Sequence, residues 1–248
     1  MANTRRSWSR SGPVILATGT PVVEALQRAT RTVPVVFVTV VDPVGDGFVA
    51  SLARPGGNIT GFTLFEYGMS SKWVELLKEM VPQAARAAVL RDSSIGSGTG
   101  QLAAIQAVAP AFKLELTPIG VHDAGEIERS VTAFAAEPTG SLIVTASTLA
   151  LVHRELIIAL AARHRLPAIY GDRTFVTMGG LLSYGPNRID PYPRAAAYID
   201  RILRGEKPEG LPVQAPTQYE LVINLNTAKA LGLTVPPTLL ARAEEVIE

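Results

Sequence analysis

The run Val35-Val36-Phe37-Val38-Thr39-Val40-Val41, which is followed by Asp42-Pro43, decides the fold. A continuous apolar and β-branched run is typical of a strand that is covered on both faces, as strands of parallel sheets are. Upstream, residues 14–17 predict another strand, which ends in a Thr-Gly-Thr turn at residues 18–20. Pro21 then suits the first position of a helix over residues 22–30. The two strands and this helix predict one βαβ unit.

The same alternation continues to the C-terminus. Further strands are predicted at residues 59–64, 87–90, 114–121, 141–145, 168–170, 181–184 and 219–224. Further helices are predicted at residues 71–80, 101–109, 124–136, 151–164, 193–203 and 227–231. Strands separated by helices indicate an α/β protein with parallel sheets. Because these units are too many for one compact sheet, we expect two Rossmann-like lobes joined by a hinge.

The lobe boundaries follow from where the helical patterns restart. The helix at residue 71 opens the second lobe, and the stretch 181–188 brings the chain back to the first. We therefore expect residues 14–66 and 186–222 in the first lobe. Residues 67–185 and 223–248 form the second lobe and a C-terminal return. Residues 1–13 are basic and polar, and we expect them to be disordered.

Composition excludes several classes of function. The 248 residues carry a net charge of +1, so no basic face is expected and nucleic acid is not a predicted partner. The chain has no cysteine, which removes disulfides, thiolate metal sites and cysteine nucleophiles. Its apolar runs are too short to cross a bilayer, so direct membrane insertion is not expected. The basic start lacks the apolar run and cleavage site of a signal peptide, and none is predicted.

Small polar residues recur where predicted strands end. In open α/β sheets, ligands bind in the crevice beyond the carboxyl ends of the strands, near free helix N-termini. The candidate ligand-binding residues are Thr18, Gly19, Thr20 and Asp42 in the first lobe and Ser93, Thr145, Ser147 and Asp172 in the second. Phe175 or Tyr184 would stack on an apolar part of the ligand. The alternative interpretation is that these residues only cap helices and form turns.

Other motifs offer weaker signals. The segment Gly96-Ser97-Gly98-Thr99-Gly100 follows a predicted strand, but its spacing is G-x-G-x-G and not the G-x-G-x-x-G of dinucleotide sites. His153 and His164 share a helix face, yet no third ligand stands at metal spacing. No nucleophile elbow is present. The sequence therefore predicts no metal, no cofactor and no catalytic residue.

Several longer segments resemble one protein family. They are Thr18-Gly19-Thr20-Pro21, Val33-Pro34-Val35-Val36-Phe37, Asp42-Pro43-Val44-Gly45, and the stretches 51–61, 179–187 and 224–237. These segments resemble the substrate-binding proteins of ABC transporters related to tryptophan- and tyrosine-binding receptors. The resemblance implies a type I periplasmic-binding fold, closure of two lobes on a small organic molecule, and delivery to a membrane permease. It implies a periplasmic location, whereas a chain that starts without a signal peptide would remain cytoplasmic.

The chain departs from the family pattern at three places. The βα units that normally precede residue 14 are absent, so the first lobe is expected to be incomplete and the strand at residues 14–17 to lie at a sheet edge. Ser147-Thr148 stands where relatives often carry Asp-Pro, which leaves amino-acid specificity open. Asp172 and Thr174 stand where an aromatic residue and a glutamate are frequent, and Asp172 would replace the lost acidic partner.

Three other interpretations stay open at this point. The first is an α/β enzyme that uses a nucleotide or sugar phosphate through the loop at residues 96–100. The second is a regulatory domain of the same fold that senses a small molecule. The third is a truncated product without function.

Overall fold

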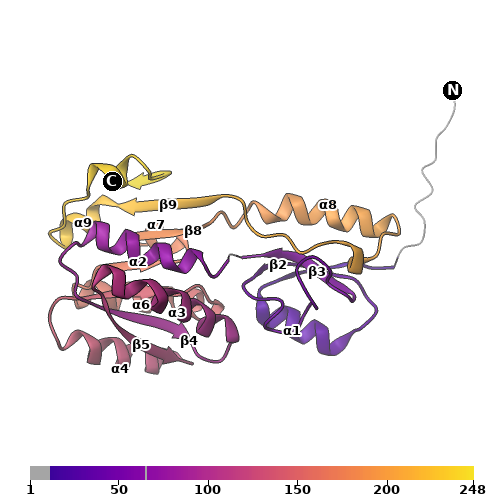
Figure 1. Ribbon diagram of the computed structural model, residues 1–248, viewed down its shortest axis with the longest axis horizontal. Helices are drawn as coiled ribbons and strands as arrows, with labels where there is room; N and C mark the ends of the chain where they lie inside the picture. Colours follow the sequence, from indigo (N-terminus) through magenta and orange to yellow (C-terminus); the bar gives the residue numbers. More distant parts are fainter. Residues whose placement is uncertain (1–11, 65) are drawn as a thin grey trace. The chain divides into compact units, whose positions relative to one another are not determined.

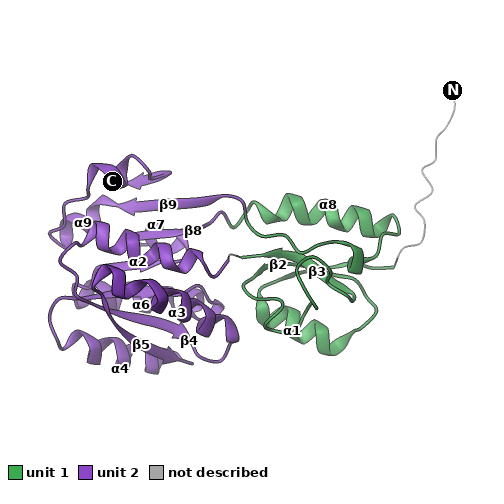
Figure 2. Ribbon diagram, in the orientation of Figure 1, with its two compact units in different colours: residues 1–64, 188–216 green, residues 65–187, 217–248 purple. Residues whose placement is uncertain are grey.

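A computed structural model describes residues 12–64 and 66–248. Most of the N-terminal segment for which disorder was predicted, residues 1–11, lies outside the described residues. The chain divides into two compact units (Figure 2): residues 1–64 and 188–216 form unit 1, and residues 65–187 and 217–248 form unit 2. Residues 219–222, which the sequence had assigned to the first lobe, lie in a strand of unit 2.

Unit 1 contains a three-stranded parallel sheet in the order β1-β2-β3. Its elements are β1 (Ile15–Thr18), α1 (Thr20–Ala29), β2 (Val35–Val40), β3 (Ile59–Thr63), α8 (Pro191–Leu203) and the short 3-10 helix η2 (Pro208–Gly210). Figure 1 shows α1 on one face of this sheet and α8 on the other. Every residue of β2 is buried, as the apolar run predicts for a strand covered on both faces.

Two apolar clusters hold unit 1 together. On one face, Val23 of α1 packs with Val35, Phe37 and Val40 of β2. On the other face, α8 supplies Ala195, Tyr198 and Ile202, which pack with Val36, Val38 and Phe62. Side chains alternate between faces from Val35 to Val38, so the single run supplies both clusters. The register shift between Phe37 and Val40 returns Val40 to the face of Phe37.

β1 lies at an edge of its sheet. Its register partners, from Ile15↔Val35 to Thr18↔Val38, are all in β2, and no other described strand pairs with it. Leu16 in its centre is 45% exposed. The prediction that this segment forms an apolar edge strand is confirmed.

Unit 2 contains a seven-stranded sheet in the order β10-β9-β8-β7-β6-β4-β5. Its strands are β4 (Arg86–Asp92), β5 (Glu115–Val121), β6 (Gly140–Val144), β7 (Ala168–Tyr170), β8 (Leu182–Pro186), β9 (Tyr219–Asn224) and β10 (Glu245–Ile247). Its helices are α2 (Met69–Met80), α3 (Gly96–Val108), η1 (Ala109–Phe112), α4 (Ala124–Ala135), α5 (Thr148–Val152), α6 (Arg154–Arg163), α7 (Arg173–Thr177), α9 (Leu225–Ala230) and α10 (Pro237–Leu240). All neighbouring strands are parallel except β8 and β9. The α/β class with predominantly parallel sheets is therefore confirmed.

The core of unit 2 is built from helices on the sheet. α2 buries Trp73, Leu76, Leu77 and Met80, the face that its sequence period predicts. A second cluster joins α4 and α6 to the strands through Ile127, Val131, Phe134, Ile157 and Leu160. Because most strands are parallel and adjacent, their carboxyl ends share one edge of the sheet, and the loops at that edge carry most of the predicted polar residues.

Candidate functional site

Four of the predicted residues gather at the carboxyl edge of the unit 1 sheet. Thr18 ends β1, and Gly19 donates its backbone N–H to the carbonyl of Val38 at 3.1 Å. Asp42 follows β2, the strand next to β1. The structure therefore brings Thr18, Gly19, Thr20 and Asp42 to one edge, as parallel pairing requires.

The loop after β2 wraps around Asp42. Its carboxylate accepts the N–H of Gly45 at 2.8 Å. A Cβ atom on Gly45 would lie 2.1 Å from Oδ2 of Asp42, so a larger residue there would displace this carboxylate. Asp42 is thus held in a fixed position beside the end of β2.

Asp46, in the same loop, was missed by the sequence reasoning. Burial raises the pKa of its carboxyl from 3.8 to about 6, with further increases from the charges of Asp42 and Glu24, while a hydrogen bond with Thr20 opposes the rise. Its Oδ2 atom is buried and has no hydrogen-bond partner among the described residues. Two carboxyl groups, four residues apart in sequence, thus lie near the start of α1 and can hold a cationic group. In the sequence, only the four-residue spacing of the two aspartates indicated this pair.

The N-terminus of α1 lies at the same edge. Its N-cap is Gly19, which makes no side-chain capping bond, and no acidic residue lies in the first turn. The first backbone N–H groups of a helix have no partner within the helix, and they carry partial positive charge. This terminus can therefore receive an acceptor oxygen from a ligand.

The four polar residues predicted in unit 2 also share an edge. They follow β4, β6 and β7, which are neighbours in the sheet. Their side chains are engaged locally: Thr145 donates to the carbonyl of Leu90 at 3.1 Å, Ser147 caps α5 by accepting from Ala150, and Asp172 caps α7 by accepting from Thr174. Ser93 lies 3.1 to 3.3 Å from the ring nitrogens of His122. Capping fixes Ser147 and Asp172 at the edge, as the alternative interpretation of the sequence anticipated for such residues.

Gln101 is a second residue that the sequence reasoning missed. It is fully buried on α3, and its side-chain amide makes two hydrogen bonds with the backbone of Ala146. Its amide nitrogen donates to the carbonyl of Ala146 at 3.0 Å, and its amide oxygen accepts the N–H of Ala146 at 2.8 Å. These two hydrogen bonds position the segment that contains Thr145 and Ser147.

The two aromatic candidates differ in their surroundings. Phe175 is 2% exposed and stacks on Tyr170 in the core, with ring centroids 4.5 Å apart. Tyr184 is partly exposed in β8 and stacks on Tyr219 at 5.9 Å. Burial raises the pKa of the Tyr184 phenol. The backbone carbonyl of Tyr184 accepts the indole N–H of Trp73 at 2.7 Å.

The glycines at residues 96–100 have a packing explanation. They form the first turn of α3 and not an open loop. A Cβ on Gly98 would lie 2.2 Å from the carbonyl oxygen of Asp92, and one on Gly100 would lie 2.5 Å from the ring of Tyr67. Close helix packing therefore accounts for two of the three glycines that suggested a nucleotide site. Within the described residues, no cluster of histidine, aspartate and glutamate can hold a metal ion.

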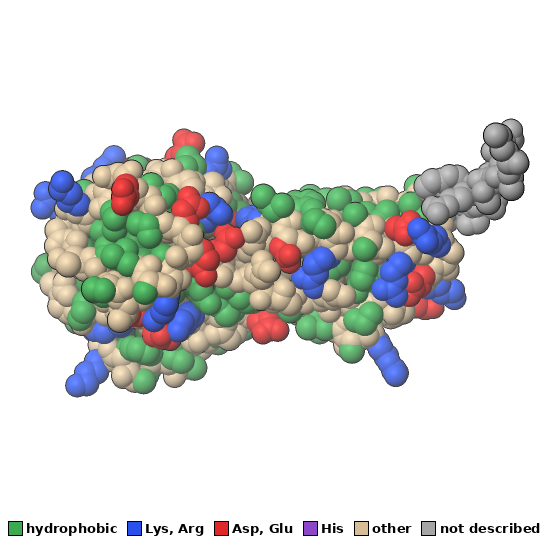
Figure 3. Space-filling model, turned by 90° about the horizontal axis from the view of Figure 1, so that it is seen from above, with side chains coloured by type: hydrophobic (Ala, Val, Ile, Leu, Met, Phe, Trp, Pro, Cys, Tyr) green, Lys and Arg blue, Asp and Glu red, His purple; other side chains and the backbone are tan. Residues whose placement is uncertain are grey.

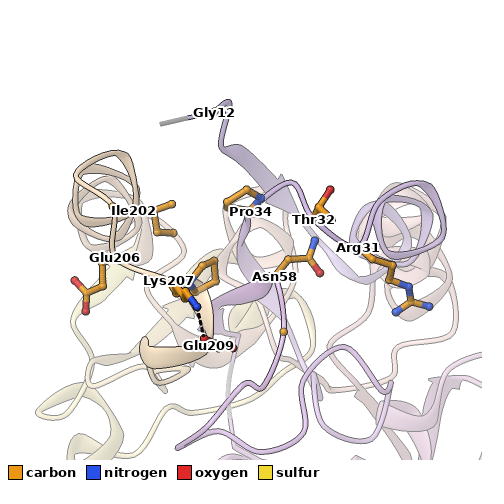
Figure 4. A pocket seen from close by; sticks show the side chains of 12 residues that line it. Gly12, Arg31, Thr32, Pro34, Asn58, Ile202, Glu206, Lys207 and Glu209 are labelled. Carbon is orange, nitrogen blue, oxygen red and sulfur yellow. Dashed lines mark ion pairs between the residues drawn. The ribbon is translucent and has the colours of Figure 1, made fainter. Parts of the chain in front are cut away.

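Two pockets lie at the opposite, amino edges of the sheets. In unit 1, a pocket of about 460 Å³ is bordered by Pro34 and Asn58, which precede β2 and β3, and by Lys207 and Glu209, which pair at 3.4 Å (Figure 4). In unit 2, a pocket of about 240 Å³ is bordered by residues at the starts of β4, β6 and β7. Neither pocket contains a residue of the predicted site.

The surface has no single dominant charge on the face drawn in Figure 3, where basic and acidic side chains alternate over both units. That mixture agrees with the net charge of +1. Among the described residues, every helix is too short or too polar to span a membrane.

A curated relative shares part of this sequence. The chain is 27% identical over 226 residues to a tyrosine-binding protein of Clostridioides difficile (strain R20291). The aligned region covers 89% of this chain and 63% of the relative. The chain thus spans less than two thirds of the length of that relative.

Solved structures share the fold. The ABC domain of Streptococcus pneumoniae in complex with L-Trp has a TM-score of 0.89 at 26% identity, over 96% of this chain and 80% of that chain. A conserved domain protein from Vibrio cholerae has a TM-score of 0.87 at 28% identity, over 94% of this chain and 78% of that chain. The fold is that of type I periplasmic binding proteins, as the sequence predicted.

A family model matches nearly the whole chain. The model describes ABC transporter substrate binding proteins and covers residues 2–247. The family segments identified in the sequence all lie within this matched range. The chain therefore belongs to the ABC transporter substrate-binding protein family.

Proposed function

We propose that this chain binds a small aromatic amino acid, or a closely related compound, and delivers it to an ABC permease. The main support is that the carboxyl groups of Asp42 and Asp46 lie beside the N-terminus of α1, which has no side-chain cap. A cationic group of the solute suits the two carboxyl groups, and an anionic group suits the helix terminus. A zwitterion satisfies both.

Unit 2 contributes the second set of contacts in this proposal. Ser93, Thr145 and Ser147 keep acceptor or donor capacity beyond their local bonds, since a hydroxyl can make up to three hydrogen bonds. Tyr184 offers a ring face beside Tyr219. Closure of the two units on the solute would exclude water from these contacts. One relative is a tyrosine-binding protein and one similar solved structure is a complex with L-Trp, which supports an aromatic side chain on the solute.

The permease partner and the location outside the cytoplasm belong to the same proposal. They are supported by membership of the family. The family consists of binding proteins, so we propose that the chain catalyses no reaction.

The test is thermal unfolding with L-tryptophan, L-tyrosine and indole-3-propionate. A ligand at about 100 times its Kd stabilises the native state by about 2.7 kcal/mol. For a chain of this size, each kcal/mol raises the Tm by about 2–4 °C. We expect a shift with at least one amino acid and a much smaller one with indole-3-propionate, which lacks the ammonium group.

Variants connect the shift to the site. Asp42→Asn and Asp46→Asn should reduce the shift, because each removes a negative charge that faces the ammonium group. Asp200→Asn is the matched control, since Asp200 is an exposed carboxylate on α8 that pairs with Arg204. Equal shifts in all three variants, or no shift with either amino acid, would overturn the proposal.

A further inference from the structure

Two buried hydroxyl groups at the carboxyl edge of the unit 1 sheet make no hydrogen bond with the described residues. Thr39 and Thr63 are 6% and 5% exposed. The Oγ1 atom of each is buried and has no hydrogen-bond partner within the described part of the chain. Burying a hydroxyl without a partner costs free energy, so such groups in a native protein call for an explanation.

Both threonines lie beside the candidate site. Thr39 is in β2, the middle strand, directly after Val38, whose carbonyl accepts the N–H of Gly19 at 3.1 Å. The next residue, Val40, is the register partner of Thr63 in β3. Thr39 therefore lies between the turn that begins α1 and Thr63, three residues before Asp42.

The backbone of Thr39 is strained. Its φ angle is +59°, a left-handed conformation that is a genuine outlier for a β-branched residue. The strand register also shifts between Phe37 and Val40, which marks a bulge or irregularity. Bulges and strained residues concentrate at binding sites, where they redirect a side chain.

This combination separates Thr39 from other buried hydroxyls. Ser141 and Ser183 are also buried without a partner. Neither has a positive φ angle, and Ser141 lies near the start of β6, at the amino edge of its sheet. The lack of a hydrogen-bond partner therefore does not by itself indicate a binding site. At Thr39 it coincides with backbone strain and with a position beside the candidate site.

We propose that the hydroxyls of Thr39 and Thr63 hydrogen-bond the carboxylate of the bound solute, next to the N-terminus of α1. This inference rests on the proposed function and deepens it. The hydroxyls and the first amides of α1 are donors, and a carboxylate accepts from several donors at once. Asp42 and Asp46 would hold the ammonium group of the same molecule. A solute group that reaches these threonines leaves water, which strengthens each hydrogen bond.

The experiment measures the Kd for L-tryptophan and L-tryptophanamide by calorimetry in Thr39→Val, Thr39→Ser, Thr63→Val and wild type. Valine keeps the shape of threonine and removes the hydroxyl, while serine keeps the hydroxyl. Thr60→Val is the matched control, because the Thr60 hydroxyl is buried in the same strand as Thr63 but donates to the carbonyl of Leu211 at 2.6 Å.

We expect Thr39→Val to weaken L-tryptophan binding about tenfold, the effect of losing a hydrogen bond to a charged group. Thr39→Ser should stay within about threefold of wild type, and L-tryptophanamide, which has no carboxylate, should respond much less to the valine change. Thr63→Val tests the same point if Thr39→Val does not fold. Thr60→Val should lower stability and leave affinity unchanged.

The outcomes distinguish the two proposals. If wild type binds L-tryptophan and both valine variants bind it equally well, this inference is wrong and the proposed function stands. If Thr39→Ser weakens binding as much as Thr39→Val, the effect comes from packing, and the inference is again wrong. If wild type binds neither L-tryptophan nor L-tyrosine, the proposed function fails and the inference falls with it.

Discussion

Replacing Asp46 by asparagine should make the stability of the protein less dependent on pH. In the folded chain, burial and the neighbouring carboxylates of Asp42 and Glu24 raise the pKa of Asp46 from 3.8 to about 6. The native state therefore holds this proton up to about pH 6, whereas the unfolded chain releases it near pH 4. Consequently the free energy of unfolding falls as pH rises through this window, and the loss persists at higher pH.

The magnitude follows from the two pKa values. Their difference corresponds to an upper bound of about 3 kcal/mol, at about 1.4 kcal/mol for each pH unit. Because Asp46 is only half buried, solvent screening reduces the effect to about 1 kcal/mol. Asparagine keeps an oxygen that can accept from Thr20 but cannot ionise. Asp46→Asn should therefore be about 1 kcal/mol more stable than wild type at pH 7.5 and nearly equal to it at pH 4.

The assay is urea unfolding followed by circular dichroism at pH 4, 5 and 7.5. Wild type and variant are compared at each pH, so that the titration of all other groups cancels. Asp200→Asn serves as control, and its difference from wild type should not grow with pH in the same direction. A stability gap for Asp46→Asn that is the same at pH 4 and pH 7.5 would show that the pKa of Asp46 is not raised.

Three further substitutions test the packing that positions the site. Gly61→Ala should destabilise unit 1 by about 3 kcal/mol, because a Cβ there would lie 2.1 Å from the carbonyl oxygen of Phe37; urea unfolding measures the loss. Trp73→Phe should cost about 2 kcal/mol in the same assay, since it removes the partly buried hydrogen bond to the carbonyl of Tyr184; an unchanged midpoint would contradict that role. Asp172→Ala should cost about 1 kcal/mol through loss of the α7 N-cap, and hydrogen exchange should show faster opening of α7.

The sequence predicted the fold well where local pattern and burial agree. The run at residues 35–41 is apolar throughout, and β2 is buried throughout. The Thr-Gly-Thr-Pro segment predicted a strand end and a helix start, and the structure has both. Periodicity sufficed in these places because tertiary packing reinforces the same preference.

It failed where tertiary contacts oppose local preference. Residues 96–100 have poor helix propensity and were predicted as a loop, yet they begin α3, because glycine permits the close approach of Gly98 to Asp92. No strand was predicted at the residues of β10, since three residues are too few for a periodic signal.

The sequence predicted which polar residues the fold brings to shared sheet edges, but not the electrostatics there. Strand ends indicated these shared edges, since connectivity alone brings the carboxyl ends of parallel strands together. The raised pKa of Asp46 depends first on burial and then on the charges of Asp42 and Glu24, and burial arises only in the folded chain. The backbone strain at Thr39 left no trace in the sequence, because it arises where the strand register shifts.

The division of each unit into two segments has a consequence for synthesis on the ribosome. Val36, Val38 and Phe62 are made early, but α8, which covers them, follows about 130 residues later. At about 5–20 residues per second, this apolar face waits for roughly 7–26 seconds without its partner helix. A nascent chain in that interval presents an uncovered sheet face and an open strand edge, which makes it a natural client for chaperones and a point where aggregation competes with folding.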